Sequence, residues 1–266
     1  MPDMSNINPG ILFCMFKGEP GTRKSTQALS FPGPQYWFSF DCKMRGINIP
    51  MREWGIDPKT ITYDDYLVTA TERTPLDRVK AKLQQLQVDC PYKTIVLDSV
   101  TSCADLILRQ TLHMKGGSGK QIAGISVSSV EDFNAEASGL TEIMGCLKDI
   151  HLTYGVNVIL IAHVIQTELR ELNGETHMSR IIVTAAKKVA AKIPAYCDEV
   201  YHFNIKSGFD VDKGGDYSLL TTHTGEDFAR TSLPLSKEII FKNDRLYTKW
   251  IAPAIDTMKQ DPPKTF

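Results

Sequence analysis

The sequence lacks an excess of charge of either sign, a long hydrophobic run and an opening signal peptide. Its 30 Lys and Arg residues against 31 Asp and Glu residues give a formal net charge of -1. Any contact with nucleic acid must therefore come from local basic patches. No apolar run is long enough to span a bilayer, and the first four residues do not begin a secretory signal peptide. We expect a cytoplasmic protein with no membrane partner.

Cysteine is sparse, and its spacing argues against two classes of site. None of the cysteines forms a C-x-x-C pair, and they lie far apart along the chain. This spacing is unlike that of a zinc site or a disulfide framework. Several cysteines stand in apolar stretches, so we expect buried free thiols in a reducing compartment. The six are Cys14, Cys42, Cys90, Cys103, Cys146 and Cys197.

What remains is the composition of an ordinary globular protein, with 42% hydrophobic and 23% charged residues. A chain of 266 residues is long enough to bury a sizeable core. The sequence has no internal repeat and no clear second domain. We predict one domain over residues 1–251 and a loose tail over residues 252–266, a stretch with three prolines and little periodicity.

Apolar runs alternate with helical spacing along the chain, which predicts an α/β fold with a mostly parallel central sheet flanked by helices. Antiparallel strands are expected toward the C-terminus. Helices are predicted over residues 74–88, 102–114, 130–154 and 184–193. Strands are predicted over residues 11–16, 35–40, 60–63, 94–98, 157–162, 199–205, 217–222 and 238–241.

Residues 18–25, with the sequence GEPGTRKS, follow the phosphate-binding pattern G-x-x-x-x-G-K-[ST], except that Arg23 replaces the second glycine. Backbone N–H groups of such a loop cradle phosphates, while the lysine reaches the outer phosphates and the hydroxyl binds Mg²⁺. An apolar strand precedes the loop and a helix follows it, and a helix N-terminus favours anions. The alternative is a plain turn between two core elements. The residues expected to bind ATP are Gly18, Gly21, Thr22, Arg23, Lys24, Ser25 and Thr26.

Asp98 is the predicted second half of this site. It ends the buried strand of residues 94–98, at the edge of an α/β sheet where ligands bind. There it would hold Mg²⁺ together with Ser25. The competing interpretation is an aspartate that caps the following helix.

His163 and Asp41 are candidates for the catalytic step, beside Lys24 and Asp98. His163 ends the strand of residues 157–162 and could face the γ-phosphate, although a structural histidine fits as well and Gln166 competes for the role. Asp41 ends the strand of residues 35–40 and could orient an attacking water. Lys43 stands two residues on, where a carboxylate would serve hydrolysis better, so ATPase activity stays open.

Basic residues gather in two places. The first group, Lys43, Arg45 and Arg52, follows the strand of residues 35–40, and we expect it to form a solvated loop surface. The second group follows His163 and could contact a nucleic-acid backbone or reach the γ-phosphate of a neighbouring subunit, with a charged helix surface as the alternative. Its members are Arg170, Arg180, Lys187, Lys188 and Lys192, and Lys115 and Lys120 in the glycine-rich segment add a weaker suggestion of strand contact.

The phosphate loop, the Asp98-Ser99-Val100 segment and the strand ending at His163 together resemble the RecA-like core of P-loop NTPases. Within that group the chain is most similar to phage-encoded RecA-like ATPases of single-strand annealing and recombination, a likeness that extends to residues 186–201 and 226–231. The resemblance covers about residues 10–250.

This resemblance implies a RecA-like fold, ATP and Mg²⁺ as cofactors, single-stranded DNA as partner and a ring or filament of identical subunits. A single-strand-binding protein would be a further partner, and the setting would be the cytoplasm of an infected bacterium. The polar segments 115–129 and 164–180 match the positions of DNA-binding loops. Arg23 and Lys43 depart from the pattern at positions that concern hydrolysis. The other functions weighed are a DNA-binding protein that uses ATP only to assemble and, with less support, a small-molecule P-loop kinase.

Overall fold

The computed structural model describes residues 10–69, 74–115, 121–122, 125–170, 176–184, 187–206 and 216–260. Its main feature is a mixed sheet with the strand order β11-β10-β9-β1-β7-β4-β2-β3, and β8 pairs with β7 outside this path. The pairs from β9 through β3 are parallel, whereas β10 and β11 are antiparallel. This confirms the predicted mostly parallel sheet with antiparallel strands near the C-terminus. The strands are β1 (Phe13–Gly18), β2 (Gln35–Ser39), β3 (Ile61–Asp65), β4 (Thr94–Asp98), β7 (Asn157–Arg170), β8 (Thr176–Ile182), β9 (Glu199–Ile205), β10 (Tyr217–Leu220) and β11 (Glu238–Phe241).

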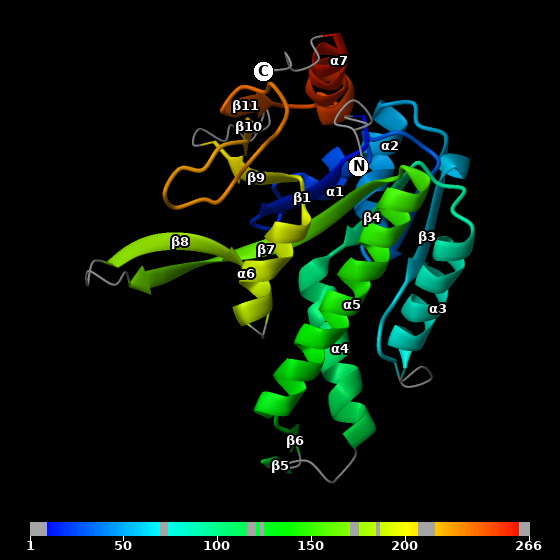
Figure 1. Cartoon of the computed structure of the whole chain (residues 1–266), viewed down its shortest axis with the longest axis vertical. Coiled ribbons are helices and arrows are strands. Elements are labelled where there is room, and N and C mark those ends of the chain that lie inside the picture. Colours follow the sequence, from blue (N-terminus) through cyan, green and yellow to red (C-terminus); the bar gives the residue numbers. More distant parts are fainter. Residues whose placement is uncertain are drawn as a thin grey trace, which may run out of the picture.

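Helices cover both faces of the sheet (Figure 1). Alternation along β1 explains why, since Phe13 and Met15 join one hydrophobic cluster while Cys14 and Phe16 join the other. Helices α3 to α6 pack on the first face, and α1 and α7 pack on the second. The α-helices are α1 (Lys24–Ala28), α2 (Asn48–Glu53), α3 (Pro75–Val88), α4 (Val100–Lys115), α5 (Val130–Tyr154), α6 (Lys187–Tyr196) and α7 (Ala252–Gln260).

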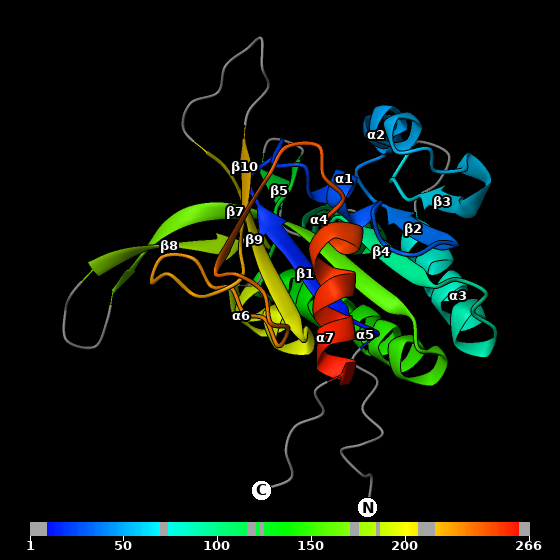
Figure 2. The same ribbon diagram turned by 90° about the horizontal axis from the view of Figure 1, so that it is seen from above.

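Two pairs of elements extend beyond the sheet. Helices α4 and α5 run together away from it, and the short strands β5 (Gln121–Ile122) and β6 (Ile125–Ser126) pair between their far ends (Figure 1). Strand β7 continues past the sheet and forms a hairpin with β8, which Figure 2 shows from above. The prediction that this strand ends at Ala162 is therefore wrong. Polar residues alternate with apolar ones in the outer half, so no continuous apolar run marks it as strand.

The C-terminal segment also differs from the predicted loose tail. A π-helical turn, η5 (Tyr247–Ile251), leads directly into α7. Ala254 and Ile255 are buried in the second cluster, so packing against the sheet stabilises a helix of low intrinsic periodicity. Residues 261–266 lie outside the described residues, and the extent of the single domain stays a prediction. No helix in the described ranges is long and apolar enough to cross a lipid bilayer.

Candidate functional site

A cleft of about 310 Å³ lies at the carboxyl ends of the parallel strands, where β1 passes into α1. This is the edge at which open α/β sheets bind ligands. The four predicted catalytic residues all line it, together with six of the seven predicted nucleotide-binding residues. The lining is Pro20, Gly21, Thr22, Arg23, Lys24, Ser25, Thr26, Asp41, Lys43, Met44, Gly46, Ile47, Asp98, Ile161 and His163.

Gly18 ends β1 just outside the cleft and starts the phosphate loop. A Cβ atom at this position would lie 2.3 Å from the carbonyl oxygen of Phe203 on β9. Only glycine therefore allows the strand to pass this close to its neighbour before the chain turns.

The Lys24 ammonium is folded back onto the loop. Its Nζ donates hydrogen bonds to the carbonyl oxygens of Gly18 at 2.9 Å and Glu19 at 2.7 Å, and to Thr22 Oγ1 at 3.2 Å. Burial lowers the pKa of Lys24 to about 8, against the opposing attraction of Asp98 and Asp41. All three acceptors are neutral oxygens, so a phosphate could replace them with a gain in charge pairing.

Arg23 occupies the left-handed backbone conformation, with φ 64° and ψ 23°, which explains why phosphate loops carry glycine here. Its guanidinium turns toward the C-terminal strands. Nη1 donates to the carbonyl oxygen of Lys242 at 3.0 Å and to Asn243 Oδ1 at 2.6 Å. The guanidinium carbon lies 4.8 Å from the centre of the Tyr217 ring, a cation–π contact. Its charge is thus engaged by protein groups.

Ser25 follows β1 on helix α1, and Asp98 ends β4. The two side chains meet although β7 lies between β1 and β4 in the sheet. Ser25 Oγ donates to Asp98 Oδ2 at 2.7 Å. Burial raises the pKa of Asp98, and the hydrogen bond from Ser25 opposes that shift. A hydroxyl and a carboxylate are hard oxygen ligands of the kind that Mg²⁺ prefers, and Mg²⁺ keeps its remaining positions for water and phosphate oxygens. The donor set fits this ion.

Asp41 forms the centre of a second set of contacts. Its Oδ2 lies 3.6 Å from His163 Nε2, and its Oδ1 accepts hydrogen bonds from Ser102 Oγ and, at 3.2 Å, from Ser99 Oγ. Burial opposes ionisation, but the contact with His163 and the hydrogen bond from Ser102 hold the pKa of Asp41 below its usual range. His163 Nδ1 is buried with no hydrogen-bond partner in the described chain.

Ser99 and Ser102 are site residues that the sequence reading missed. The run of hydroxyl side chains directly after Asp98 was the available signal, because residues that follow a strand at this edge lie close to the ligand-binding site. Thr101 belongs to the same run, and its Oγ1 accepts a hydrogen bond from the backbone N–H of His163 at 3.2 Å.

Those of the predicted basic contacts that the structure describes do not line this cleft. Arg180 on β8 pairs with Asp227 at 2.7 Å and lies 3.8 Å from Glu226. Arg170 ends β7, Lys115 ends α4, and Lys187 and Lys188 begin α6. Lys120 lies outside the described residues.

The fold and the cleft together define a P-loop nucleotide-binding protein: a strand–loop–helix unit with its lysine and serine, and a carboxylate from a separate parallel strand. A family model described as AAA domain matches residues 13–233. This span is most of the chain, and the protein belongs to that family. A search of curated proteins gives no match.

Proposed function

We propose that this protein binds ATP with Mg²⁺ and thereby controls its binding to single-stranded DNA, which it anneals or pairs with a homologous strand. The Ser25–Asp98 hydrogen bond beside Lys24 is the observation that carries the nucleotide half of the proposal. Lys24 would exchange its carbonyl acceptors for the outer phosphates. Ser25 and Asp98 would hold Mg²⁺, which neutralises charge on the phosphate oxygens.

Asp41 supports a slow hydrolysis. Its carboxylate lines the cleft and could orient a water near the outer phosphate. A carboxylate whose pKa lies below its usual range stays ionised, but it is a weak base. His163 and Ser102, which lower that pKa, therefore orient Asp41 at the expense of its proton affinity. This balance favours nucleotide binding over rapid turnover.

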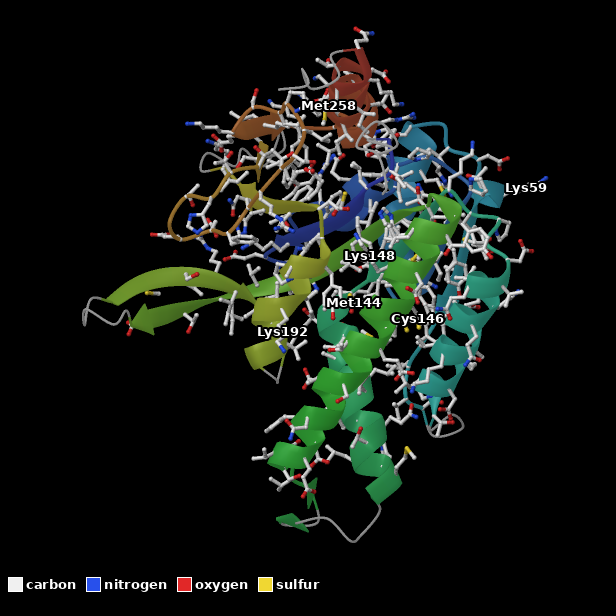
Figure 3. The ribbon with its side chains drawn as sticks, viewed as in Figure 1. Lys59, Met144, Cys146, Lys148, Lys192 and Met258 are labelled. Atoms are coloured by element: carbon white, nitrogen blue, oxygen red, sulfur yellow. The ribbon has the colours of Figure 1, made fainter. Side chains whose placement is uncertain are left out.

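The β7–β8 hairpin and α6 are the proposed DNA contact. Lys192 on α6 is exposed, and Figure 3 labels it on the same side of the molecule as the hairpin. Lys187, Lys188 and Arg170 belong to the same elements, and lysine and arginine contacts to phosphate give affinity without sequence preference. Strand β7 carries His163 in the cleft and runs on into the hairpin, so one strand connects the two proposed sites.

A ring or filament of identical subunits remains part of the proposal. Arg180 is one of the basic residues predicted to reach the γ-phosphate of a neighbouring subunit, but its guanidinium is paired with Asp227 within the same chain. Such a role would require this pair to open. Lys115, at the end of α4, and Lys120 stay candidate DNA contacts.

The test measures binding of a labelled oligothymidylate with and without ATP and Mg²⁺, in the wild type and in Lys24→Ala. We expect ATP to change the affinity of the wild type and to have no effect on Lys24→Ala. The matched control is Lys59→Ala, which removes an exposed lysine outside the cleft. If wild type and Lys24→Ala bind the strand equally under all conditions, the gating proposal is wrong.

Phosphate release separates this function from its closest alternative, a DNA-binding protein that uses ATP only to assemble. The proposal expects slow release that Asp41→Asn reduces to the level of Lys24→Ala. A single-turnover assay with no release above that level would favour the alternative. Transfer of phosphate to nucleosides would instead support a kinase.

A further inference from the structure

A second cavity of about 640 Å³ lies beside the phosphate cleft. It lies between the segment that connects β2 to β3 and the edge strand β3 itself. The connecting segment contributes the 3₁₀ turn η2 (Met44–Ile47) and residues of α2. The η2 turn lines both hollows and so forms the wall between them. The volume falls in the range of pockets that hold small molecules, and nothing in the phosphate-binding function accounts for it.

The wall and floor of this cavity are largely apolar. Ile47 is buried, Met44, Met51 and Ile61 are half-buried, and the ring of Tyr63 is 49% exposed. Methionine side chains adapt to flat ring surfaces, and an exposed tyrosine offers a face on which a planar ring can stack. This part of the cavity suits an aromatic heterocycle.

Two cations, Lys43 and Arg45, lie at the same cavity, and Lys43 also lines the phosphate cleft, where its charge acts on Asp41. Lys43 and Arg45 are exposed, and neither side chain forms a hydrogen bond or an ion pair within the described ranges. Some exposed lysines of the fold are paired, as in Lys80–Glu142 at 2.9 Å and Lys249–Asp244 at 2.7 Å. A free lysine and a free arginine together are the usual partners of a phosphate group.

We propose that this cavity is a second nucleotide-binding site, distinct from the phosphate loop. The phosphate lies against Lys43 and Arg45, and the base lies against Tyr63 and the methionines. Asp65 accepts a hydrogen bond from Ser39 through Oδ1, and its carboxylate lines the cavity, where the amino group of a base would donate to it. The ligand is either a free nucleoside monophosphate or one nucleotide of a single strand, since both present the same chemistry.

Cys42 gives a direct readout, because its exposed thiol lines the cavity. Burial, followed by the charges of Asp65 and Asp41, raises the pKa of this thiol, so alkylation with iodoacetamide is run at about pH 9. A bound nucleotide slows alkylation of Cys42 and leaves Cys146 unchanged. Cys146 lies on α5, where Figure 3 labels it, and serves as the internal reference.

The experiment uses the full chain carrying Lys24→Ala, so that a failure of the ATP-gating proposal does not affect it. Protection of Cys42 is titrated with deoxyadenosine monophosphate and, separately, with oligothymidylate. Lys43→Ala with Arg45→Ala, and Tyr63→Ala, should each weaken protection about tenfold. The control pair Arg52→Ala with Lys59→Ala removes the same charge from the same segment outside the cavity and should change it less than twofold.

Protection by the monophosphate identifies a site for free nucleotides, and protection by the oligonucleotide alone identifies a site for a strand. Absence of protection by either ligand overturns the proposal. An equal loss in the cavity variants and in the control pair also overturns it, because the effect would then be general electrostatic attraction. Thermal melting of each variant verifies that it is folded.

Discussion

Lys17 and Lys24 stand on either side of the same loop, and both are buried, with 2% and 4% of their surface exposed. Burial lowers the pKa of each to about 8. Their partners differ. Lys24 is held by two carbonyl oxygens and a hydroxyl, whereas Lys17 donates to the carbonyl oxygen of Arg180 at 3.3 Å beside the Arg180–Asp227 ion pair.

The comparison separates a binding lysine from a structural one. An anion can displace the neutral acceptors of Lys24 with a net gain in charge pairing. Around Lys17 a carboxylate is already present, since Asp227 pairs with Arg180 and lies 3.4 Å from His202. Burial of His202 lowers its pKa to about 4, so this ring stays neutral and adds no charge.

Removal of the Asp227 carboxylate should lower the free energy of unfolding more than any other substitution predicted here. Asp227→Asn leaves the buried Lys17 and the half-buried Arg180 with only the exposed Glu226 as a counter-charge, 3.8 Å from Arg180, which costs about 3 kcal/mol in the free energy of unfolding. Urea denaturation measures it. The control Asp256→Asn breaks an exposed contact to Lys259 and should cost less than about 0.5 kcal/mol. Equal losses in Asp227→Asn and Asp256→Asn would mean that Lys17, Arg180 and Asp227 do not form a buried ion network.

The two lysines should differ sharply in ATP binding. Lys24→Ala should weaken ATP affinity about a hundredfold, because the phosphates lose their charged donor. Lys17→Met should change it less than about threefold, because that side chain faces the base of the hairpin. Isothermal titration calorimetry measures both. A comparable loss in Lys17→Met would show that Lys17 also serves the nucleotide.

The pH dependence tests the same contrast. Lys24 loses its charge near pH 8 in the folded, unliganded protein, so ATP affinity should fall about tenfold between about pH 7 and pH 9. Stability should move in the opposite direction. Below about pH 8 both lysines carry a buried charge in the folded protein, which costs free energy of folding. Between about pH 8 and the ordinary pKa of 10.5 the folded lysines are neutral, so the free energy of unfolding should rise with pH in this range. The residual ATP affinity of Lys24→Ala should stay constant over the same pH range, which a titration at each pH measures.

Arg23→Gly should have the smallest effect. Glycine relieves the left-handed backbone at a gain of about 1 kcal/mol, while the bonds to Lys242 and Asn243 are lost at a similar cost. The melting temperature should therefore change little, and ATP affinity should stay within about twofold, because the guanidinium faces the C-terminal strands. A large loss of ATP affinity would place the Arg23 charge at the phosphates.

Much of the fold follows from local patterns. The strand of residues 94–98, the helix of residues 130–154 and the strand of residues 199–205 stand where the apolar spacing predicts them. The outer half of β7 and helix α7 do not, because each depends on a partner distant in sequence: β8 pairs with the first, and the second hydrophobic cluster holds the other. Periodicity in a short window carries no information about such partners.

By itself the sequence determined the phosphate loop, the class of fold and the pairing of Lys24 and Ser25 with Asp98, because residue type and spacing at strand ends fix that chemistry. Only the tertiary structure decided where charge is available. It turned Arg23 toward Asn243, placed His163 and Ser102 around Asp41, and put Lys43 and Arg45 at a cavity, where neither side chain forms a hydrogen bond or an ion pair with the rest of the described residues. The physical reason is that the energy of a charge depends on the groups around it, and those come from segments far apart in the chain.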